Sequence, residues 1–166
     1  AIVGCGAISK ASGPGFIENP LAEVVALCDP VGERAASRAK EWGISPKIYT
    51  DYEDVLNDPT IDAVELLTPT HMHMDQSVSA LAAGKHVSCQ KPISKNMEEA
   101  THIAKASENG NTIFRVAENY LYYPPIVKAK ELIDSGAIGE PSLIRIRSLN
   151  GKPKPYPFIQ IEEDAF

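Results

Sequence analysis

Two short segments near the amino terminus carry residues whose types and spacing suit a phosphate-containing ligand. One is an apolar run that leads into Gly4-Cys5-Gly6, and the other is Val24–Cys28, which ends at Asp29. In a βαβ unit the first glycine permits a tight turn, and the second removes a side chain, so that backbone amides at a helix amino terminus reach a pyrophosphate. A carboxylate about 20 residues further on accepts hydrogen bonds from ribose hydroxyls. This order predicts a dinucleotide-binding site.

Ser9 stands where the third glycine of this pattern would be, and it loosens helix–strand packing without blocking the ligand. The predicted phosphate loop consists of Gly4, Gly6, Ala7, Ile8 and Ser9. A βα turn with no ligand is the alternative reading of two glycines alone. The succession of strand, glycines, helix, strand and acid favours the ligand site.

Composition narrows the class of protein. The chain has 166 residues, of which 43% are hydrophobic, and a net charge of −6 with no cluster of basic residues. An acidic chain repels nucleic acid, and no apolar run approaches the roughly 20 residues of a membrane span. The three cysteines lie far apart, which suits a reducing compartment. We therefore expect a cytoplasmic globular protein without a nucleic-acid or membrane partner, and further residues before Ala1.

Apolar runs and helical patterns alternate along the chain. Strands are predicted at Ala1–Gly4, Glu23–Cys28, Lys47–Tyr49, Ala63–Leu67, His86–Cys89 and Thr112–Val116. Helices that each end at or near a glycine are predicted at Gly32–Trp42, Met74–Ala83, Met97–Asn109 and Pro125–Ser135. The segment Ser12–Gly15 should shorten or kink the first crossover helix, because it contains Pro14. This rhythm predicts an α/β fold, a Rossmann doubly wound parallel sheet in the order 3-2-1-4-5-6.

The pattern changes after Gly139. Residues Ser142–Leu149 alternate apolar with polar side chains, as in a strand with one wet face. Such a strand needs partners, so it predicts the start of a second, α+β domain that the chain does not complete. We place a dinucleotide-binding domain at residues 1–123 and the beginning of a substrate-binding and oligomerisation domain at residues 124–166.

Three polar motifs follow the fourth, fifth and sixth predicted strands, at the edge where open α/β sheets bind ligands. They read Thr-Pro-Thr-His-Met-His at 68–73, Gly-Lys-His-Val-Ser-Cys-Gln-Lys-Pro at 84–92, and Glu-Asn-Tyr-Leu-Tyr-Tyr-Pro at 118–124. At these motifs, and over essentially the whole chain, the sequence resembles the Gfo/Idh/MocA family of glucose–fructose oxidoreductases and inositol dehydrogenases. The family pattern reads approximately TPNxxH, AGKHVxxEKP and a later Asn-x-Arg-x-x-Pro.

The resemblance implies an enzyme that uses NAD or NADP to oxidise a sugar, polyol or related hydroxy compound. Lys91 matches the lysine that touches the substrate hydroxyl, where its ammonium would stabilise the developing alkoxide. The other positions implied near the cofactor are Thr68, Pro69, Thr70, His73, Gln90 and Asn119. The resemblance also suggests a cis bond at Lys91-Pro92 and a homo-oligomer at full length. Without it, Lys91 would read as a surface lysine.

Two departures from the family pattern count against full activity. Gln90 replaces a glutamate and Thr70 replaces an asparagine, and Gln90 supplies no negative charge beside Lys91. The histidine base that the family carries in a later Asp-x-x-x-His segment does not occur before Phe166, so we expect no turnover from the chain as given. A non-catalytic dinucleotide-binding regulator or sensor is therefore the second reading, which Gln90 favours, while Lys91 and Asn119 favour the enzyme.

The remaining expectations concern cofactor choice and the histidines. Asp29 should favour NAD over NADP, because a 2′-phosphate would meet its carboxylate, and Arg34 could soften this preference. His86 reads as structural and His102 as solvated, whereas the role of His71 and His73 stays open. Those two histidines lack a third ligand of suitable spacing, so no metal site is expected.

Overall fold

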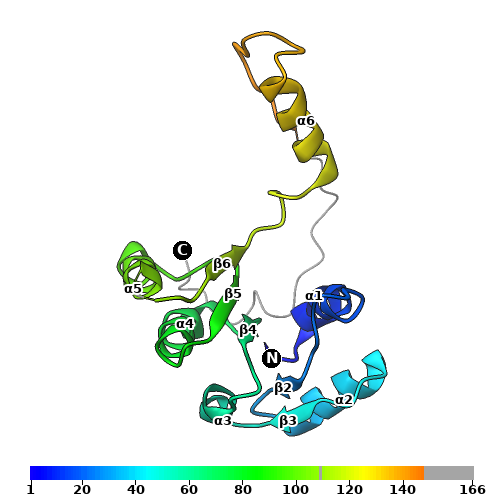
Figure 1. Ribbon diagram of the computed structural model, residues 1–166, viewed down its shortest axis with the longest axis vertical. Coiled ribbons are helices and arrows are strands. Elements are labelled where there is room, and N and C mark those ends of the chain that lie inside the picture. Colours follow the sequence, from blue (N-terminus) through cyan, green and yellow to red (C-terminus); the bar gives the residue numbers. More distant parts are fainter. Residues whose placement is uncertain (109, 148–166) are drawn as a thin grey trace. The chain divides into compact units, whose positions relative to one another are not determined.

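Short strands and the helices between them make up most of the chain (Figure 1). The computed structural model describes residues 1–108 and 110–147. The strands are β1 (Ile2–Val3), β2 (Ala26–Cys28), β3 (Lys47–Tyr49), β4 (Ala63–Leu66), β5 (His86–Gln90) and β6 (Phe114–Ala117). The helices are α1 (Ala7–Ile17), α2 (Gly32–Trp42), α3 (Tyr52–Asn57), α4 (His73–Ala82), α5 (Met97–Glu108), α6 (Pro124–Asp134) and the 3-10 turn η1 (Thr70–Met72). None of the helices in these described residues is long and apolar enough to cross a membrane.

The six strands form one sheet in the order β3-β2-β1-β4-β5-β6, and every neighbouring pair is parallel. This confirms the predicted doubly wound arrangement. The strands β1, β2 and β3 follow one another toward one edge of the sheet, and β4, β5 and β6 follow one another toward the other edge. The loops after the neighbouring strands β1 and β4 therefore lead to helices on opposite faces of the sheet. In such sheets ligands bind beyond the carboxyl ends of the strands at this reversal.

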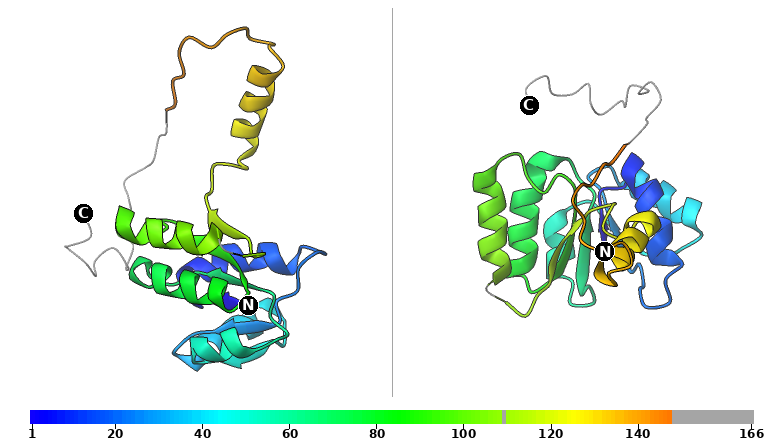
Figure 2. Two further views of the ribbon diagram at one scale, coloured as in Figure 1. Left: turned by 60° about the vertical axis from the view of Figure 1, so that its left-hand side comes forward. Right: turned by 90° about the horizontal axis from the view of Figure 1, so that it is seen from above.

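Helices cover the sheet on both faces (Figure 2). On one face α1 and α2 pack over β1 and β2, where Ala35 contributes to a core with Ile2 and Leu27. On the other face α3, α4 and α5 pack over the sheet, and Val55 and Ala80 belong to that core. The strands carry apolar side chains toward both layers, which is why they read as short, nearly continuous apolar runs.

Helix α1 continues through Pro14, so a shortening at this residue is not found, while the kink given as its alternative stays a prediction. The helix runs from Ala7 to Ile17 with Pro14 inside it. A proline in a helix removes one hydrogen bond, and packing can offset that loss. Here the packing is tight, because a Cβ added at Gly13 would lie 2.1 Å from Cζ2 of Trp42 on α2. Gly13 thus lets the two helices approach closely.

Helix α3 was missed by the sequence analysis. It is only six residues long, which leaves little room for a helical period. Asp51 nevertheless caps it, because its carboxylate accepts a hydrogen bond of 3.0 Å from the amide of Glu53. The buried side chains of Val55 and Leu56 then fasten it to the sheet. An acidic cap followed by two apolar residues was the available signal.

The contacts divide the chain into two units, of which the first is Ala1–Glu118 and the second begins at Asn119. Within the second unit, α6 starts at Pro124, a favourable first helical residue, and ends before Gly136, which has a φ of +69°. The strand predicted at Ser142–Leu149 does not form over residues 142–147, and the rest of it lies outside the described residues. A lone strand has no neighbour to pair with, and none is described for this segment.

Candidate functional site

The loop from β1 to α1 makes a tight turn next to Leu67, the residue that follows β4. Gly4 has a φ of +92°, and a Cβ there would lie 2.9 Å from the backbone carbonyl carbon and oxygen of Leu67. The amide of Gly4 donates a hydrogen bond of 2.8 Å to the carbonyl oxygen of Cys28. Only glycine combines this backbone conformation with this close approach. Gly4 therefore fixes the path by which the chain enters α1.

The amino terminus of α1 offers uncapped amides to the exterior. Gly6 is the N-cap and gives no side-chain cap, and a Cβ added there would meet nothing within 4 Å. Ala7 and Ile8, the first two helical residues, are exposed. The hydroxyl of Ser9 is buried and donates 2.7 Å to the carbonyl oxygen of Gly6. Free amides and the positive end of the helix dipole suit an anion in the open space beside Gly6.

Asp29 lies directly beside this loop, at the end of β2. It is only 4% exposed, and its Oδ2 accepts a hydrogen bond of 2.9 Å from the amide of Cys5. Its Oδ1 accepts another of 2.9 Å from the amide of Val31. The exposed Arg34 places Nη1 3.7 Å from the same Oδ1. The carboxylate is thus held rigidly, and each oxygen keeps a second acceptor position for a ligand hydroxyl.

The loop after β4 turns its threonine inward. The hydroxyl of Thr68 donates a hydrogen bond of 2.5 Å to Oε1 of Gln76 on α4. The exposed Pro69 then leads into η1, which begins at the half-buried Thr70. Because the Thr68 side chain is already engaged, its backbone and the residues after it are the groups that this loop presents at the sheet edge.

His73 joins this loop to the one after β5. It is 1% exposed, its Nε2 lies 2.8 Å from the carbonyl oxygen of Thr68, and its Nδ1 lies 2.8 Å from that of Pro92. Both ring nitrogens are therefore occupied by backbone carbonyls. In this geometry His73 connects the loops after β4 and β5, and its predicted place beside a cofactor stays a prediction.

The loop after β5 carries Lys91. The peptide bond between Lys91 and Pro92 is cis, as predicted. The side-chain Oε1 of Gln90 accepts a hydrogen bond of 2.9 Å from the amide of Lys91. Lys91 itself is exposed, so its ammonium is free to meet a ligand. Gln90 thus serves the backbone with its oxygen and retains its NH₂ group for other partners.

Parallel strands bring most of the predicted site residues to one edge of the sheet. The loops after β1, β2, β4 and β5 hold Gly4, Gly6, Asp29, Thr68 and Lys91. Asn119 belongs to the second unit, so its part in the site remains a prediction. His86 accepts 2.9 Å from the amide of Ile113 at Nδ1, which is a structural role. His102 is exposed on α5.

Sequence reasoning missed one residue at this site, Arg38. Its guanidinium reaches from α2 to the carbonyl oxygens of Cys5 and Gly6, at 3.3 and 3.1 Å from Nη2. The available signal was its position on α2. Arg38 lies with Ala35 and Ala39 on the face of the helix that packs against the sheet, where an apolar residue is expected.

The electrostatics of the loop argue against a cysteine nucleophile. Burial raises the pKa of the Cys5 thiol to about 11 and that of Cys28 to about 12. Both thiols are therefore neutral near pH 7, and a neutral thiol is a poor nucleophile. Among the residues that the structure describes, no three His, Cys, Asp or Glu side chains gather in a group that could hold a metal ion.

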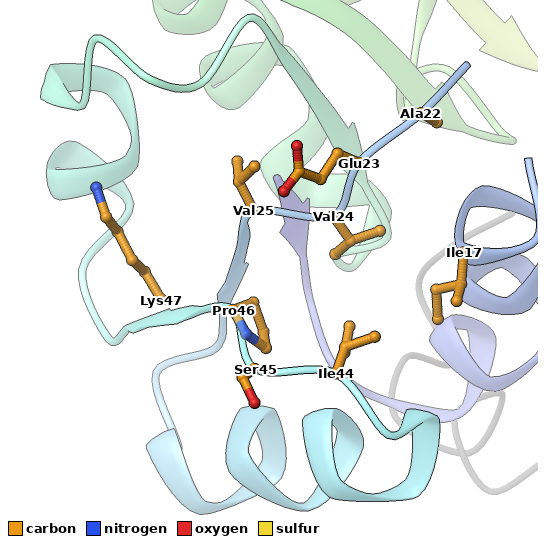
Figure 3. A pocket seen from close by; sticks show the side chains of 9 residues that line it. All are labelled: Ile17, Ala22, Glu23, Val24, Val25, Ile44, Ser45, Pro46 and Lys47. Carbon is orange, nitrogen blue, oxygen red and sulfur yellow. The ribbon is translucent and has the colours of Figure 1, made fainter. Parts of the chain in front are cut away.

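A pocket of about 430 Å³ lies elsewhere in the first unit (Figure 3). Its lining includes the apolar side chains of Ile17, Val24, Ile44 and Pro46. Val24 precedes β2, and Pro46 precedes β3, so the pocket is at the amino ends of these strands. It therefore lies at the opposite edge of the sheet from the glycine loop and shares no residue with the site described above.

Several dehydrogenases are similar to this chain in sequence. An inositol 2-dehydrogenase from Salmonella typhimurium is 34% identical over 134 residues, which cover 80% of this chain and 40% of that protein. A levoglucosan dehydrogenase from Pseudarthrobacter phenanthrenivorans is 35% identical over 132 residues, 80% of this chain and 32% of that protein. The matched part of this chain thus covers well under half the length of each of these relatives.

Solved structures agree with the sequence matches. The scyllo-inositol dehydrogenase from Lactobacillus casei, with bound NAD(H) and scyllo-inositol, matches with a TM-score of 0.76 and 30% identity over 83% of this chain and 41% of that one. Residues 1–118 match the model of the oxidoreductase family with an NAD-binding Rossmann fold. The chain therefore belongs to the Gfo/Idh/MocA oxidoreductase family.

Proposed function

We propose that this chain is the dinucleotide-binding part of an oxidoreductase that transfers hydride between NAD and a sugar, polyol or related hydroxy compound. The observation that carries the proposal is the glycine loop. A Cβ at Gly6 would point into open space beside uncapped helix amides, and Asp29 is fixed alongside. The family assignment of residues 1–118 and the similarity to inositol and levoglucosan dehydrogenases support it.

The residues at the sheet edge fit such a cofactor. The amides at the start of α1 would bind the pyrophosphate, and Asp29 would accept hydrogen bonds from the adenosine ribose. The bound NAD would supply the hydride acceptor. Further contacts are proposed for the loops after β4, β5 and β6. They involve Pro69, Thr70, Gln90, Lys91 and Asn119.

Lys91 is the proposed catalytic residue. It is exposed at the end of β5, on a loop that His73 anchors through the carbonyl oxygen of Pro92. A positively charged group beside the reacting hydroxyl would stabilise the alkoxide that develops as a base removes the hydroxyl proton; hydride transfer from the carbon to NAD would then convert it to the carbonyl. Gln90 offers no charge of its own, so Lys91 would act without an adjacent carboxylate from that position.

The cofactor preference and the rest of the protein follow from the same proposal. Asp29 favours NAD, since a 2′-phosphate would approach a buried carboxylate that already accepts two amide hydrogen bonds. Arg34 is close enough to weaken this preference. Residues 124–166 would begin the substrate-binding and oligomerisation domain of a cytoplasmic homo-oligomer.

In a second candidate function, the protein binds the dinucleotide at the same site but does not catalyse hydride transfer. The specific observation in its favour is Gln90, whose neutral amide stands where the family has a glutamate and whose oxygen serves the amide of Lys91. Such a protein would bind NAD as a regulator or sensor and would not oxidise polyols.

Two measurements test the proposal. Titration of the chain with NADH, followed by nicotinamide fluorescence, should give saturable binding, and its absence would refute the dinucleotide site. In the longer protein that carries this chain, Lys91→Ala should lower kcat on an inositol or sugar substrate while NADH affinity stays within a few-fold. Lys95→Ala is the matched control, because Lys95 is paired with Glu99 on α5 and lies outside the motif. An unchanged kcat in Lys91→Ala would refute the catalytic role of Lys91, whereas NADH binding without any turnover by the unaltered longer protein would favour the regulator.

A further inference from the structure

Arg38 is a buried cation on α2 that contacts the backbone of the phosphate loop between β1 and α1. Its side chain is 8% exposed, and Nη2 donates to the carbonyl oxygens of both Cys5 and Gly6. Nη1 pairs with the carboxylate of Glu41 one turn further along α2. The guanidinium carbon also lies 5.7 Å from the ring centroid of Trp42, within the range of a cation–π contact.

A buried charge at this position calls for an explanation. The other buried residues of α2 are the small apolar Ala35 and Ala39, which pack against the sheet without polar partners. Burying a cation costs free energy unless its hydrogen bonds are made, and Nε of Arg38 has no partner among the described residues. Simple packing would be served better by an apolar side chain. The hydrogen bonds to the carbonyl oxygens of Cys5 and Gly6 are contacts that an apolar side chain could not make, and they explain the arginine.

These contacts set the direction of two amides. In a trans peptide the carbonyl and the following N–H point in opposite directions. When Arg38 draws the carbonyl oxygens of Cys5 and Gly6 toward the interior, the N–H groups of Gly6 and Ala7 must point outward. Within the described residues neither of these amides has a backbone or side-chain partner. Space for a ligand exists beside them, because a Cβ at Gly6 would meet nothing within 4 Å.

Ser9 holds the same peptide from the helix side. Its hydroxyl donates to the carbonyl oxygen of Gly6, so this oxygen accepts from both Ser9 and Arg38. Two independent hydrogen bonds, from Ser9 and from Arg38, therefore fix the orientation of the Gly6 carbonyl. A loop that is already in its binding conformation loses less entropy when a ligand arrives.

We propose that Arg38 is a positioning residue of the pyrophosphate site, which orients the amides of Gly6 and Ala7 and places a fixed positive charge behind them. This rests on the proposed dinucleotide site and adds to it a residue outside the glycine pattern. Arg38 acts through the backbone and does not itself contact the ligand.

The test separates phosphate binding from ribose binding. Arg38→Met keeps the length and apolar stem of the side chain but removes the donors and the charge. It should weaken NADH and ADP binding about tenfold, because the two amides lose their fixed orientation and the charge beside them, while the affinity for adenosine changes less than twofold. Lys40→Met, on the exposed face of the same helix, is the matched control and should leave all three affinities unchanged.

A spectroscopic readout tests orientation directly. In ¹H–¹⁵N correlation spectra, the amide resonances of Gly6 and Ala7 should shift on addition of ADP, and they should shift less in Arg38→Met. Should Arg38→Met fail to fold, Arg38→Lys decides instead. Its ammonium reaches the carbonyls with fewer donors, and we expect a threefold to fivefold loss that is confined to the phosphate-bearing ligands.

Two results would overturn the inference alone while the dinucleotide site stands. One is an equal NADH affinity in the unaltered chain and the deciding Arg38 variant. The other is a parallel loss for adenosine and ADP, which would show a merely structural role. If the unaltered chain does not bind NADH, the proposed function itself fails and the inference fails with it.

Discussion

Alanine substitutions at Gly4 and Gly6 should separate folding from ligand binding, although the two glycines are neighbours in one loop. At Gly6 the backbone φ is −76°, which alanine adopts readily, and the new methyl meets no atom within 4 Å. The chain-entropy gain of about 0.4–1 kcal/mol and the weaker N-cap preference of alanine nearly cancel. Gly6→Ala should therefore shift the melting temperature by less than about 2 °C.

The same methyl occupies the space in which a pyrophosphate would approach the amides. Losing one hydrogen bond to a charged group costs about 1.5–3 kcal/mol. NADH should therefore bind Gly6→Ala about 10–150-fold more weakly than the unaltered chain. Nicotinamide fluorescence titration measures the dissociation constant, and differential scanning fluorimetry measures the melting temperature of the same samples.

Gly4→Ala is the matched control with the opposite expectation. A left-handed backbone costs alanine about 1–2 kcal/mol. The contact with the Leu67 carbonyl adds about 1–3 kcal/mol. At roughly 2–4 °C per kcal/mol, the melting temperature should fall by about 10 °C. NADH affinity within twofold of the unaltered value in Gly6→Ala, or an unchanged melting temperature in Gly4→Ala, would refute the reasoning.

Three further outcomes are expected. Asp29→Asn removes the carboxylate charge but keeps an amide-accepting oxygen, so the ratio of NADPH to NADH dissociation constants should fall about tenfold; tighter NADPH binding by the unaltered chain would contradict this. Burial raises the pKa of Cys5, Cys28 and Cys89 to about 11, 12 and 11, which leaves about one thiol in a thousand or fewer ionised at pH 8. All three should react with iodoacetamide only as the chain unfolds, as mass spectrometry of a time course would show, and rapid labelling of any one in the native state would count against it. Hydrogen bonds from Lys47, Thr60 and Tyr49 lower the pKa of Asp58 below its usual range; the stability that Asp58 contributes is present above its unfolded pKa and is lost as the pH falls through the lower, folded pKa. Urea unfolding should therefore show Asp58→Asn to be less stable than the unaltered chain at pH 6, with the difference shrinking below about pH 4.

Local patterns were sufficient to predict the sheet. Each buried strand is a compact apolar run, and the crossover helices α2, α4 and α5 each end near a glycine, so the order of the strands follows from the sequence alone. The right-handed crossover rule then leaves few topologies, and the predicted strand order is the one found. The boundaries were less accurate: β1 was expected at Ala1–Gly4 and spans Ile2–Val3.

The contacts inside the site could not be predicted in the same way. The sequence placed Gly6 and Asp29 near a ligand from their spacing, but it gave no indication that Arg38 would reach the loop from another helix. His73 was expected to line the cofactor site, and only the fold shows that its ring nitrogens face two backbone carbonyls. Such partners are distant in sequence and depend on side-chain rotamers, which periodicity does not encode. The shortening of α1 at Pro14 was a wrong expectation for the same reason, because the contact between Gly13 and Trp42 is tertiary.

That contact has a consequence for how this sequence can change over time. The indole of Trp42 occupies the volume that any side chain at Gly13 would need, so the two positions cannot vary independently. A larger residue on α1 becomes tolerable only after a smaller one has appeared on α2. The same ring also faces the guanidinium of Arg38, and losing the indole would leave that group with more room to move. Drift at a helix–helix contact would then alter ligand affinity, even though neither residue lies at the ligand.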